Sequence, residues 1–420
     1  MHPHDKRGGG DVRTPAARLE EAAGLCHAID LDIVDARTLG LGRRTPSTLI
    51  GSGMVAEIAE EVEQSEIGLV VIDGSLTPIQ QRNLERAWKC KVIDRTALIL
   101  EIFGERAATR EGRMQVELAS LTYQRSRLVR SWTHLERQRG GFGFLGGPGE
   151  RQIESDRRQI DERVVRIRGD LEKVVRTRTL HRSARKKVPY PVVALVGYTN
   201  AGKSTLFNRL TSSNVDARDQ VFATLDPTMR RLDLPSGRTV ILSDTVGFIS
   251  DLPTMLVAAF RATLEEVIEA DVILHVRDIA NPDTEQQRAD VRSVLKDLDI
   301  DLEAERYCYE VLNKIDLMDP ETRGRFDAMA RSEDAVAVSA VTGENLSGLL
   351  ALIDASLASR EETFAVSLDL SDGASIAWIY SHGEVLDRKD EGMEARMKVR
   401  MTPTEKARLE NRLGKTLVPA

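Results

Sequence analysis

The chain has 420 residues, 41% of them hydrophobic, so it is long enough to bury a core in each of several domains. Because it has no run of about 18 apolar residues and no apolar signal core near its start, we expect neither a membrane span nor a secretory leader. Its three cysteines are widely separated, without CxxC or Cys/His pairing. This favours free thiols in a reducing compartment, and we expect a cytoplasmic monomer.

We expect residues 1–27 to form a flexible N-terminus. Residues 28–110 alternate short apolar runs, LDIVDARTL, GLVVID and KVIDR, with the helical patterns SGMVAEIAEEVEQ and PIQQRNLERAW. This alternation is typical of a small α/β domain with a mostly parallel sheet.

Residues 111–187 carry two apolar stripes with seven-residue spacing. The stripes are Met114, Leu118, Leu121, Leu128, Trp132 and Leu135, then Ile153, Ile160, Val164, Ile167, Leu171 and Val174. They predict two long helices packed as a hairpin. The glycine-rich segment GGFGFLGGPGE, residues 140–150, separates them, and we expect it to be a mobile loop at the hairpin tip.

The hairpin segment is basic although the whole chain has a net charge of −7. Between Thr122 and Lys187 there are 18 Lys and Arg residues against 8 Asp and Glu. Such a segment is typical of a polyanion-binding surface, and equally of a solvated helical face with many ion pairs. Charge alone leaves both interpretations open.

Two further units complete a multidomain α/β chain. Residues 190–358 begin with the strand PVVALVG and alternate strands and helices. From residue 364 to 420, FAVSLDL, SIAWIY and MKVRM are expected to be strands and 403–413 a closing helix, which makes a small α+β domain.

The segment GYTNAGKS, from Gly197 to Ser204, matches GxxxxGK[ST] between an apolar strand and an apolar-periodic helix. Backbone N–H groups of such a loop wrap phosphates, and the helix N-terminus adds partial positive charge. Lys203 would reach the β- and γ-phosphates, and the Ser204 hydroxyl would bind Mg²⁺.

Two later segments suit the loops that sense the terminal phosphate. In VFATLDP, residues 221–227, Thr224 would give a second hydroxyl to Mg²⁺, so Ser204 and Thr224 are the expected metal ligands. After the strand RTVILS, Asp244 would hold Mg²⁺ through water, and the Gly247 N–H would contact the γ-phosphate.

Asn313-Lys314-Ile315-Asp316 follows the strand CYEVL and predicts a preference for guanine. The Asp316 carboxylate would accept hydrogen bonds from guanine N1 and N2, which adenine cannot supply. Asn313 would brace the loop, the Lys314 stem would lie along the base, and Ser339-Ala340 would contact guanine O6 through a backbone N–H.

These elements together predict a Ras-like P-loop GTPase domain. The residues expected at its nucleotide are Gly197, Tyr198, Thr199, Asn200, Ala201, Gly202, Lys203, Ser204, Thr205, Phe222, Ala223, Thr224, Leu225, Asp226, Asp244, Thr245, Val246, Gly247, Asn313, Lys314, Ile315, Asp316, Ser339 and Ala340.

From about residue 29 to 358 the sequence resembles the HflX-type, ribosome-associated GTPases. The most similar segments are 92–128, beginning VIDRTALILEIF, then GGPGERQIESDRR and DTVGFISDLP, followed by FRATLEEV at 260–267. The resemblance implies GTP binding, association with the large ribosomal subunit, and separation or rescue of stalled ribosomes. Some members also hydrolyse ATP, but where the family often has GSGK this chain has Gly51-Ser52-Gly53-Met54, which puts such a site in doubt.

The resemblance gives the basic hairpin a target, ribosomal RNA, whose phosphates would be contacted largely without sequence specificity. The expected contacts are Arg125, Arg127, Arg130, Arg137, Arg139, Arg151, Arg157 and Arg158.

Phe248 stands where many related switches have the glutamine that orients the attacking water. The catalytic group is therefore unknown, and Gly247, Phe248 and Asn200 are the candidates. Asn200 would hold a potassium ion that supplies positive charge, or would only brace its loop. Alternatively, docking on the ribosome would order the switch loops and so complete the site. Phe248 would instead form an apolar lip with Ile249, Leu252 and Pro253.

Two other functions are compatible with the sequence. One is a GTP-gated regulator that binds a non-ribosomal RNA or protein. The other is an RNA chaperone that hydrolyses both ATP and GTP.

Overall fold

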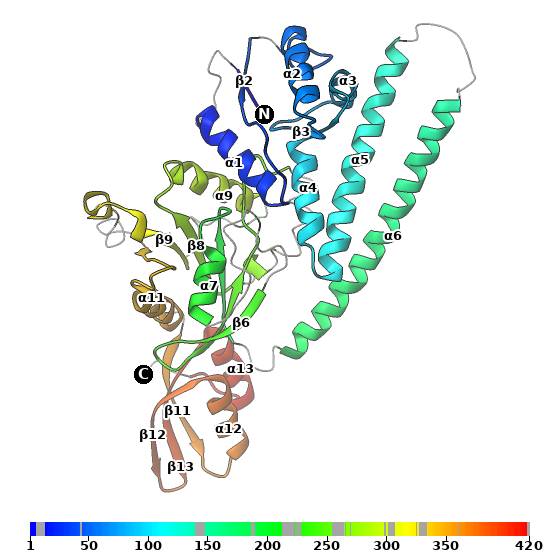
Figure 1. Cartoon of the computed structure of the whole chain (residues 1–420). Helices are drawn as coiled ribbons and strands as arrows, with labels where there is room; N and C mark the ends of the chain where they lie inside the picture. Colours follow the sequence, from blue (N-terminus) through cyan, green and yellow to red (C-terminus); the bar gives the residue numbers. More distant parts are fainter. Residues whose placement is uncertain are drawn as a thin grey trace.

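The computed structural model describes residues 1–5, 13–42, 44–138, 148–185, 190–211, 222, 228–253, 264, 266–268, 270–297, 300, 307–324, 326, 334–359 and 361–417. Of these, 5, 129–138, 148–153, 175, 177–185 and 404 are described by their backbone alone. They form an N-terminal α/β domain, a helical hairpin, a second α/β domain and a small C-terminal domain (Figure 1). The predicted multidomain α/β fold is confirmed.

The N-terminal domain is built on parallel strand pairs, as predicted. Its strands are β1 (His2–Asp5), β2 (Thr38–Leu41), β3 (Leu69–Ile72) and β4 (Lys91–Asp94), and its helices are α1 (Pro15–His27), α2 (Ser52–Gln64), α3 (Pro78–Trp88) and α4 (Arg95–Arg106). β1 pairs with β2 and β3 with β4. The Met1 amino group donates to the Val71 carbonyl at 2.9 Å and so links the two pairs.

Two expectations for this domain are wrong. Residues 1–27 are not a flexible tail where the structure describes them, because they contain β1 and α1. The Thr14 hydroxyl caps α1 by accepting from the Ala17 N–H. A strand is expected at residues 31–39, but the observed strand β2 begins only at Thr38. Its partner β1 pairs with Thr38–Leu41, and no described strand lies beside residues 31–37.

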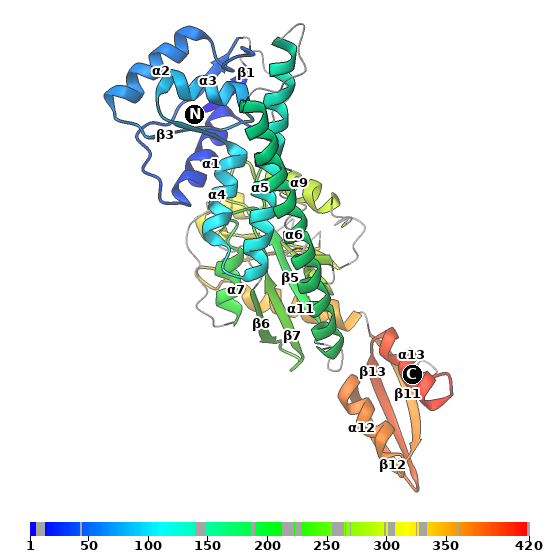
Figure 2. The same ribbon diagram turned by 90° about the vertical axis from the view of Figure 1, so that its right-hand side faces the viewer.

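Helices α5 (Arg110–Gln138) and α6 (Pro148–Arg185) lie side by side and confirm the hairpin (Figures 1 and 2). Ion pairs join them, Glu117 with Arg163 at 2.7 Å and Arg125 with Asp161 at 3.0 Å. Most of the glycine-rich loop lies outside the described residues. Among the residues that are described, no helix is both long and apolar enough to cross a bilayer.

The second α/β domain has a six-stranded sheet in the order β10-β9-β8-β5-β7-β6. The strands are β5 (Val192–Gly197), β6 (Thr228–Asp233), β7 (Thr239–Asp244), β8 (Val272–Asp278), β9 (Cys308–Asn313) and β10 (Ala335–Ala337); the helices are α7 (Lys203–Thr211), α9 (Thr284–Lys296), η1 (Ile315–Leu317) and α11 (Leu346–Ser359). All neighbours are parallel except the edge strand β6, which is antiparallel to β7.

Alternate side chains of β5 face two different cores. Val193 and Leu195 pack in a cluster with α7 and α11. Ala194 and Val196 point to the other face, where the cluster continues into α4 of the N-terminal domain through Ile99. The two α/β domains therefore share one hydrophobic core, and separating them would expose apolar surface.

The C-terminal domain contains β11 (Glu362–Asp369), α12 (Gly373–His382), β12 (Glu384–Glu391), β13 (Glu394–Met401) and α13 (Pro403–Leu413), with sheet order β11-β13-β12. The α+β prediction is confirmed, but SIAWIY is helical and not a strand. The Asp372 carboxylate caps this helix by accepting from the Ser375 N–H. The helix begins at this cap, which the prediction from apolar residues did not consider. It packs Ile379 into the domain core.

Arg127 does not belong to the RNA-facing set predicted for the hairpin. Its guanidinium lies 3.0 Å from the Asp94 carboxylate, at the end of β4, and also bonds Tyr123 and Gln81. Only 17% of the Arg127 side chain and 2% of the Asp94 side chain are exposed. Arg127 therefore fastens α5 to the N-terminal domain, and the expectation that it contacts RNA is wrong.

We expect Arg127→Ala to destabilise the protein by about 2–4 kcal/mol, because it leaves the buried Asp94 carboxylate without this cation. The matched control is Arg158→Ala, which removes an exposed helical ion pair with Glu162 and should have no measurable effect. Urea unfolding followed by tryptophan fluorescence, to which the buried Trp88 contributes, measures both. Equal effects of the two substitutions would contradict the structural role of Arg127.

Candidate nucleotide-binding site

Two glycines allow the loop between β5 and α7 to pass close to its neighbours. A Cβ atom on Gly197 would lie 2.2 Å from the Val276 carbonyl oxygen, and one on Gly202 would lie 2.3 Å from the Asn313 amide nitrogen. Gly202 has a φ of +88°, and Asn200 between them also has a positive φ, of 58°. The loop therefore follows the left-handed path that exposes backbone N–H groups to an anion.

Lys203 is the first residue of α7 and is buried at the centre of this loop. Its ammonium donates to the carbonyl oxygens of Gly197 at 3.0 Å and Tyr198 at 2.8 Å. Burial lowers the pKa of Lys203 to about 8, against the opposing effect of the Asp244 carboxylate. A phosphate bound here would restore the charged form of the lysine.

Ser204 and Asp244 meet where a magnesium ion is expected. The Ser204 hydroxyl donates to the Asp244 carboxylate at 2.7 Å, and Asp244 ends β7 fully buried. An adjacent hydroxyl and carboxylate are oxygen donors of the kind that Mg²⁺ prefers, so these residues fit the ion. The other expected ligand, Thr224, lies outside the described residues together with Ala223, Leu225 and Asp226.

The segment after Asp244 is joined to the phosphate loop by backbone hydrogen bonds. The Thr199 N–H donates to the Phe248 carbonyl at 2.7 Å, and the Phe248 N–H donates to the Gly197 carbonyl at 3.1 Å. Gly247 comes directly before Phe248, and a Cβ there would come within 2.9 Å of Thr199 Cα and 3.1 Å of Lys203 Nζ. We call residues 245–250, so attached, the switch segment.

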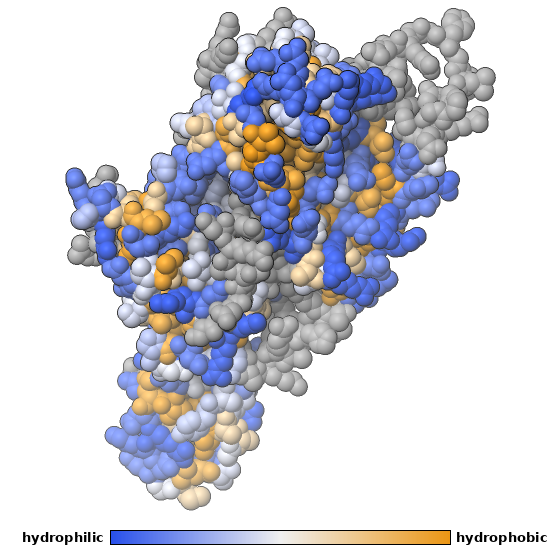
Figure 3. All heavy atoms as spheres, in the orientation of Figure 1, coloured by the Kyte–Doolittle hydropathy of each residue, from blue (hydrophilic) through white to orange (hydrophobic). Residues whose placement is uncertain are grey.

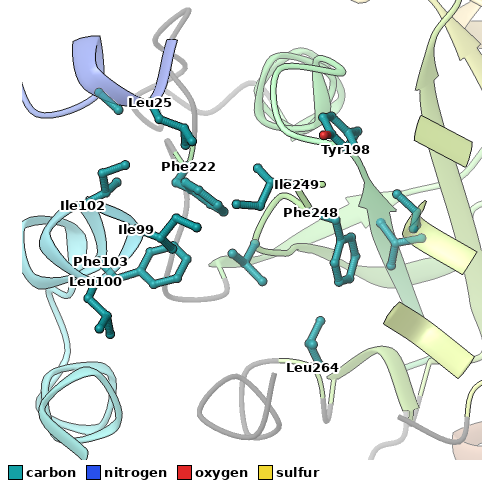
Figure 4. Close-up of a cluster of buried hydrophobic side chains, with 14 of the residues drawn as sticks. Leu25, Ile99, Leu100, Ile102, Phe103, Tyr198, Phe222, Phe248, Ile249 and Leu264 are labelled. Carbon is teal, nitrogen blue, oxygen red and sulfur yellow. The ribbon is translucent and has the colours of Figure 1, made fainter. Parts of the chain in front are cut away.

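The Phe248 side chain points away from this loop and into the core shared by the two α/β domains (Figure 4). It is 1% exposed and lies in one apolar cluster with Ile249 and Leu264. Phe222 is in the same cluster, with its ring edge-to-face on Phe103 of α4 at 4.6 Å. Any contact of Phe222 with a nucleotide would therefore come from its backbone.

Asn313 connects the three segments expected around the base. Its side-chain amide donates to the Ala201 carbonyl at 2.9 Å, and its side-chain oxygen accepts from the Ala340 N–H at 3.0 Å. Lys314 has a φ of +71°, and its ammonium lies 2.8 Å from the Asp278 carboxylate at the end of β8. The two hydrogen bonds of Asn313 therefore fix the positions of the phosphate loop and of both base-reading segments relative to one another.

The remaining predicted residues lie around this frame. Asp316 is exposed in η1 beside the buried Ile315, so its carboxylate is accessible to a ligand. Ser339 is buried behind Ala340, Thr205 lies in the first turn of α7, and Thr245 and Val246 are buried in the switch segment.

A polar cluster that the sequence did not predict joins the N-terminal domain to this site. The Tyr198 hydroxyl accepts from Arg13 at 2.9 Å and from the Ser250 N–H at 2.6 Å, and donates to Glu21 at 2.5 Å. The Ser250 hydroxyl also donates to Glu21, at 2.6 Å, and Arg95 donates to the Ser250 carbonyl at 3.1 Å. We call these five residues the interdomain cluster.

The interdomain cluster is largely buried, and each of its charged side chains pairs with one of opposite sign. Arg13 also pairs with Asp290 of α9 at 2.5 Å, and Arg95 with Asp73 at 2.6 Å. Burial and the Glu21 carboxylate raise the pKa of Tyr198, so its hydroxyl stays protonated and able to donate. Arg13 and Glu21 come from a part of the chain that we expected to be a flexible tail, and no motif marks them.

Comparisons with known proteins agree with these features. Family models described as GTP-binding GTPase N-terminal, GTP-binding GTPase middle region, 50S ribosome-binding GTPase and HflX C-terminal domain match residues 16–104, 106–185, 192–314 and 326–420. GTPase HflX of Magnetococcus marinus is 49% identical over 93% of this chain and 90% of its own length. GTPase HflX of Escherichia coli is 46% identical over 78% of this chain and 76% of its own length. GTPase HflX of Lacrimispora saccharolytica is 41% identical over 90% of this chain and 88% of its own length.

We expect the affinity for GDP to fall about tenfold between pH 7 and 9, and about fivefold of this between pH 8 and 9, because the free site then loses the Lys203 proton that phosphate binding requires. Titration with fluorescent GDP at pH values of about 7, 8 and 9 measures this. A guanidinium stays charged throughout, so Lys203→Arg should bind more weakly but show no such fall. An unchanged affinity of the unaltered chain over this range would contradict the prediction.

Proposed function

The chain belongs to the HflX family of GTPases and hydrolyses GTP, and from this we propose that it acts on the large ribosomal subunit to separate or rescue stalled ribosomes. One observation carries the proposal. A buried GTP-binding frame is joined through the interdomain cluster to the domain that anchors a basic helical hairpin. The match of residues 192–314 to the model described as 50S ribosome-binding GTPase supports this partner.

In the proposed GTP complex the phosphates lie on the loop from Gly197 to Thr205, with Lys203 at the β- and γ-phosphates. Ser204 and Thr224 hold Mg²⁺, which neutralises charge on the phosphate oxygens, and Asp244 holds it through water. Asp316 reads guanine while Asn313 keeps that loop in place; its bonds to Ala201 and Ala340 support this assignment.

Phe248 does not orient the attacking water in this proposal, because its side chain is buried in the shared core. Charge neutralisation therefore comes from a potassium ion held by Asn200, whose positive φ turns it outward at an exposed position of the loop. The Gly247 N–H contacts the γ-phosphate once the switch segment has moved. Both requirements make intrinsic hydrolysis slow.

The hairpin supplies the RNA-binding surface in the proposal. Arg125, Arg157 and Arg158 have side chains that are 42%, 50% and 81% exposed, although each pairs with a carboxylate of α6. Hydrophilic residues line the outer edge of α6 (Figure 3). Exposed pairs of this kind are weak, so phosphates can displace the carboxylates. The side chains of Arg130, Arg137, Arg139 and Arg151 lie outside the described part and remain predictions.

The alternative of a second, ATP-hydrolysing site receives little support. The N-terminal domain has a cavity of about 220 Å³ between α1, α2 and β3, but acidic residues line it, including Asp32, Asp35, Glu61 and Glu66. Although Arg37 pairs with Asp35 and Glu61, carboxylates outnumber cations there, which disfavours a phosphate. Met54, in place of the lysine that family members often have, adds no positive charge.

GTP turnover with and without large ribosomal subunits, in potassium and in sodium, tests the proposal. We expect slow turnover of the free protein, and stimulation by subunits of at least about tenfold that is larger in potassium. Asn200→Ala should abolish the cation difference and keep the response to subunits, while Lys203→Ala should remove GTP binding.

Fast turnover in sodium without subunits would refute both the cation and the partner. Turnover unchanged by subunits, together with binding to another RNA or protein only in the GTP state, would establish the alternative regulator. ATP turnover that survives Asp316→Ala would instead indicate a second nucleotide site.

A further inference from the structure

The β6–β7 hairpin extends from the nucleotide site to the opposite end of the GTPase domain. At its root Thr228 faces Asp244, whose carboxylate accepts from the Ser204 hydroxyl. Its tip is a tight turn, in which the Leu234 N–H donates to the Arg238 carbonyl at 2.8 Å and Gly237 has a φ of +85°. Six residues of strand correspond to about 20 Å, so one rigid element connects the two ends.

The tip of this hairpin holds the connection to the C-terminal domain. The N–H and hydroxyl of Ser236 donate to the Asp354 carboxylate of α11, at 2.9 and 2.7 Å. Arg238 donates to Glu361 at 2.7 Å, and both of these side chains are only 16% exposed. Glu361 lies between the end of α11 and Glu362, the first residue of β11.

The pair between Arg238 and Glu361 is partly desolvated. Burial raises the pKa of Glu361, and the Arg238 cation opposes that shift. A second ion pair, of Arg400 on β13 with Glu384 on β12, lies close enough to affect Glu361 electrostatically. A partly desolvated pair of this kind favours one arrangement over many.

Among the described strands, β6 lies at one edge of this sheet and pairs with β7 alone, so one strand interface holds it. Of its six side chains Leu232 alone is buried, in the core cluster with α11. Its first residue follows directly on the predicted Mg²⁺-binding loop, residues 221–227. A ligand that binds this loop and breaks the hydrogen bond between Ser204 and Asp244 would therefore displace the residues at the root of the hairpin.

We propose that the β6–β7 hairpin is a lever by which the nucleotide sets the orientation of the C-terminal domain, with Ser236 and Arg238 as its contact points. Mg²⁺ with GTP shifts the hairpin relative to the rest of the sheet, and the tip moves the end of α11 and Glu361. In the part of the chain that the structure describes, the C-terminal domain meets the remainder of the protein at a narrow connection (Figures 1 and 2), so a small shift there has a large effect on its orientation.

Electron spin resonance distances in the full-length chain test the lever. Spin labels go on exposed positions of α9 and α12, through Ala289→Cys and Ala374→Cys, after the three native cysteines are replaced by alanine. We expect the distance to shift by roughly 5 Å between GDP and a non-hydrolysable GTP analogue. GDP affinity is measured for every variant, so that loss of binding is not mistaken for loss of coupling.

Charge reversal at the tip should break the coupling. Arg238→Glu should abolish the nucleotide-dependent shift, and the exchanged pair Arg238→Glu with Glu361→Arg should restore it. Arg231→Glu is the matched control, because Arg231 lies on β6 of the same hairpin and makes an exposed pair with Asp233, away from the tip. One distance in both nucleotide states, or a shift that persists in Arg238→Glu, would overturn the proposal.

Discussion

The Tyr198 hydroxyl is the contact on which the arrangement of the site depends. It is a phosphate-loop side chain, yet its partners are Arg13 and Glu21 of the N-terminal domain and the backbone of Ser250. Charges as deeply buried as these are tolerated only when each has a partner, so removing one member would leave the others uncompensated. The cluster therefore links the phosphate loop, the switch segment and the N-terminal domain into one unit.

This link gives Phe248 a definite role. Its backbone bonds to Gly197 and Thr199, and its ring fills the core shared with α4. A glutamine at this position would place an amide in that core, at a cost of about 1–3 kcal/mol. The residue that in many switches orients water is here an anchor, which holds the switch segment on the phosphate loop. In the proposed function, the switch segment has to move before hydrolysis becomes efficient.

The sequence predicted the parts that depend on local spacing. The GxxxxGKS loop, the Asp244 strand end and the Asn313 segment meet as expected, because the carboxyl ends of neighbouring parallel strands share one edge of a sheet. The helical hairpin followed from its seven-residue stripes, because two helices with such stripes bury them against each other. Thr224 and its neighbours lie outside the described residues, and their roles stay predictions.

The failures concern residues whose partners are distant in the chain. In the sequence, Arg127 resembles the other cations of a basic helix. Its contact with Asp94, 33 positions away, becomes visible only in the folded structure. Glu21 and Ser250 are 229 positions apart, and no pattern relates them. SIAWIY is a failure of a different kind, because its apolar content suits a strand as well as a helix, and the Asp372 cap at the start of α12 was not used. The periodicity of a sequence indicates which face of a helix or strand is buried. It does not indicate which charged group of another element lies against that face.

The central claim is that the interdomain cluster holds the switch segment on the phosphate loop in the absence of GTP. Hydrogen–deuterium exchange of the Thr199, Phe248 and Ser250 amides tests it most directly, in the nucleotide-free protein and in Glu21→Ala. The account predicts slow exchange of all three amides in the unaltered chain, and loss of that protection in the variant while the β5 amides stay protected. Fast exchange in the unaltered chain, or equal protection in both proteins, would contradict it.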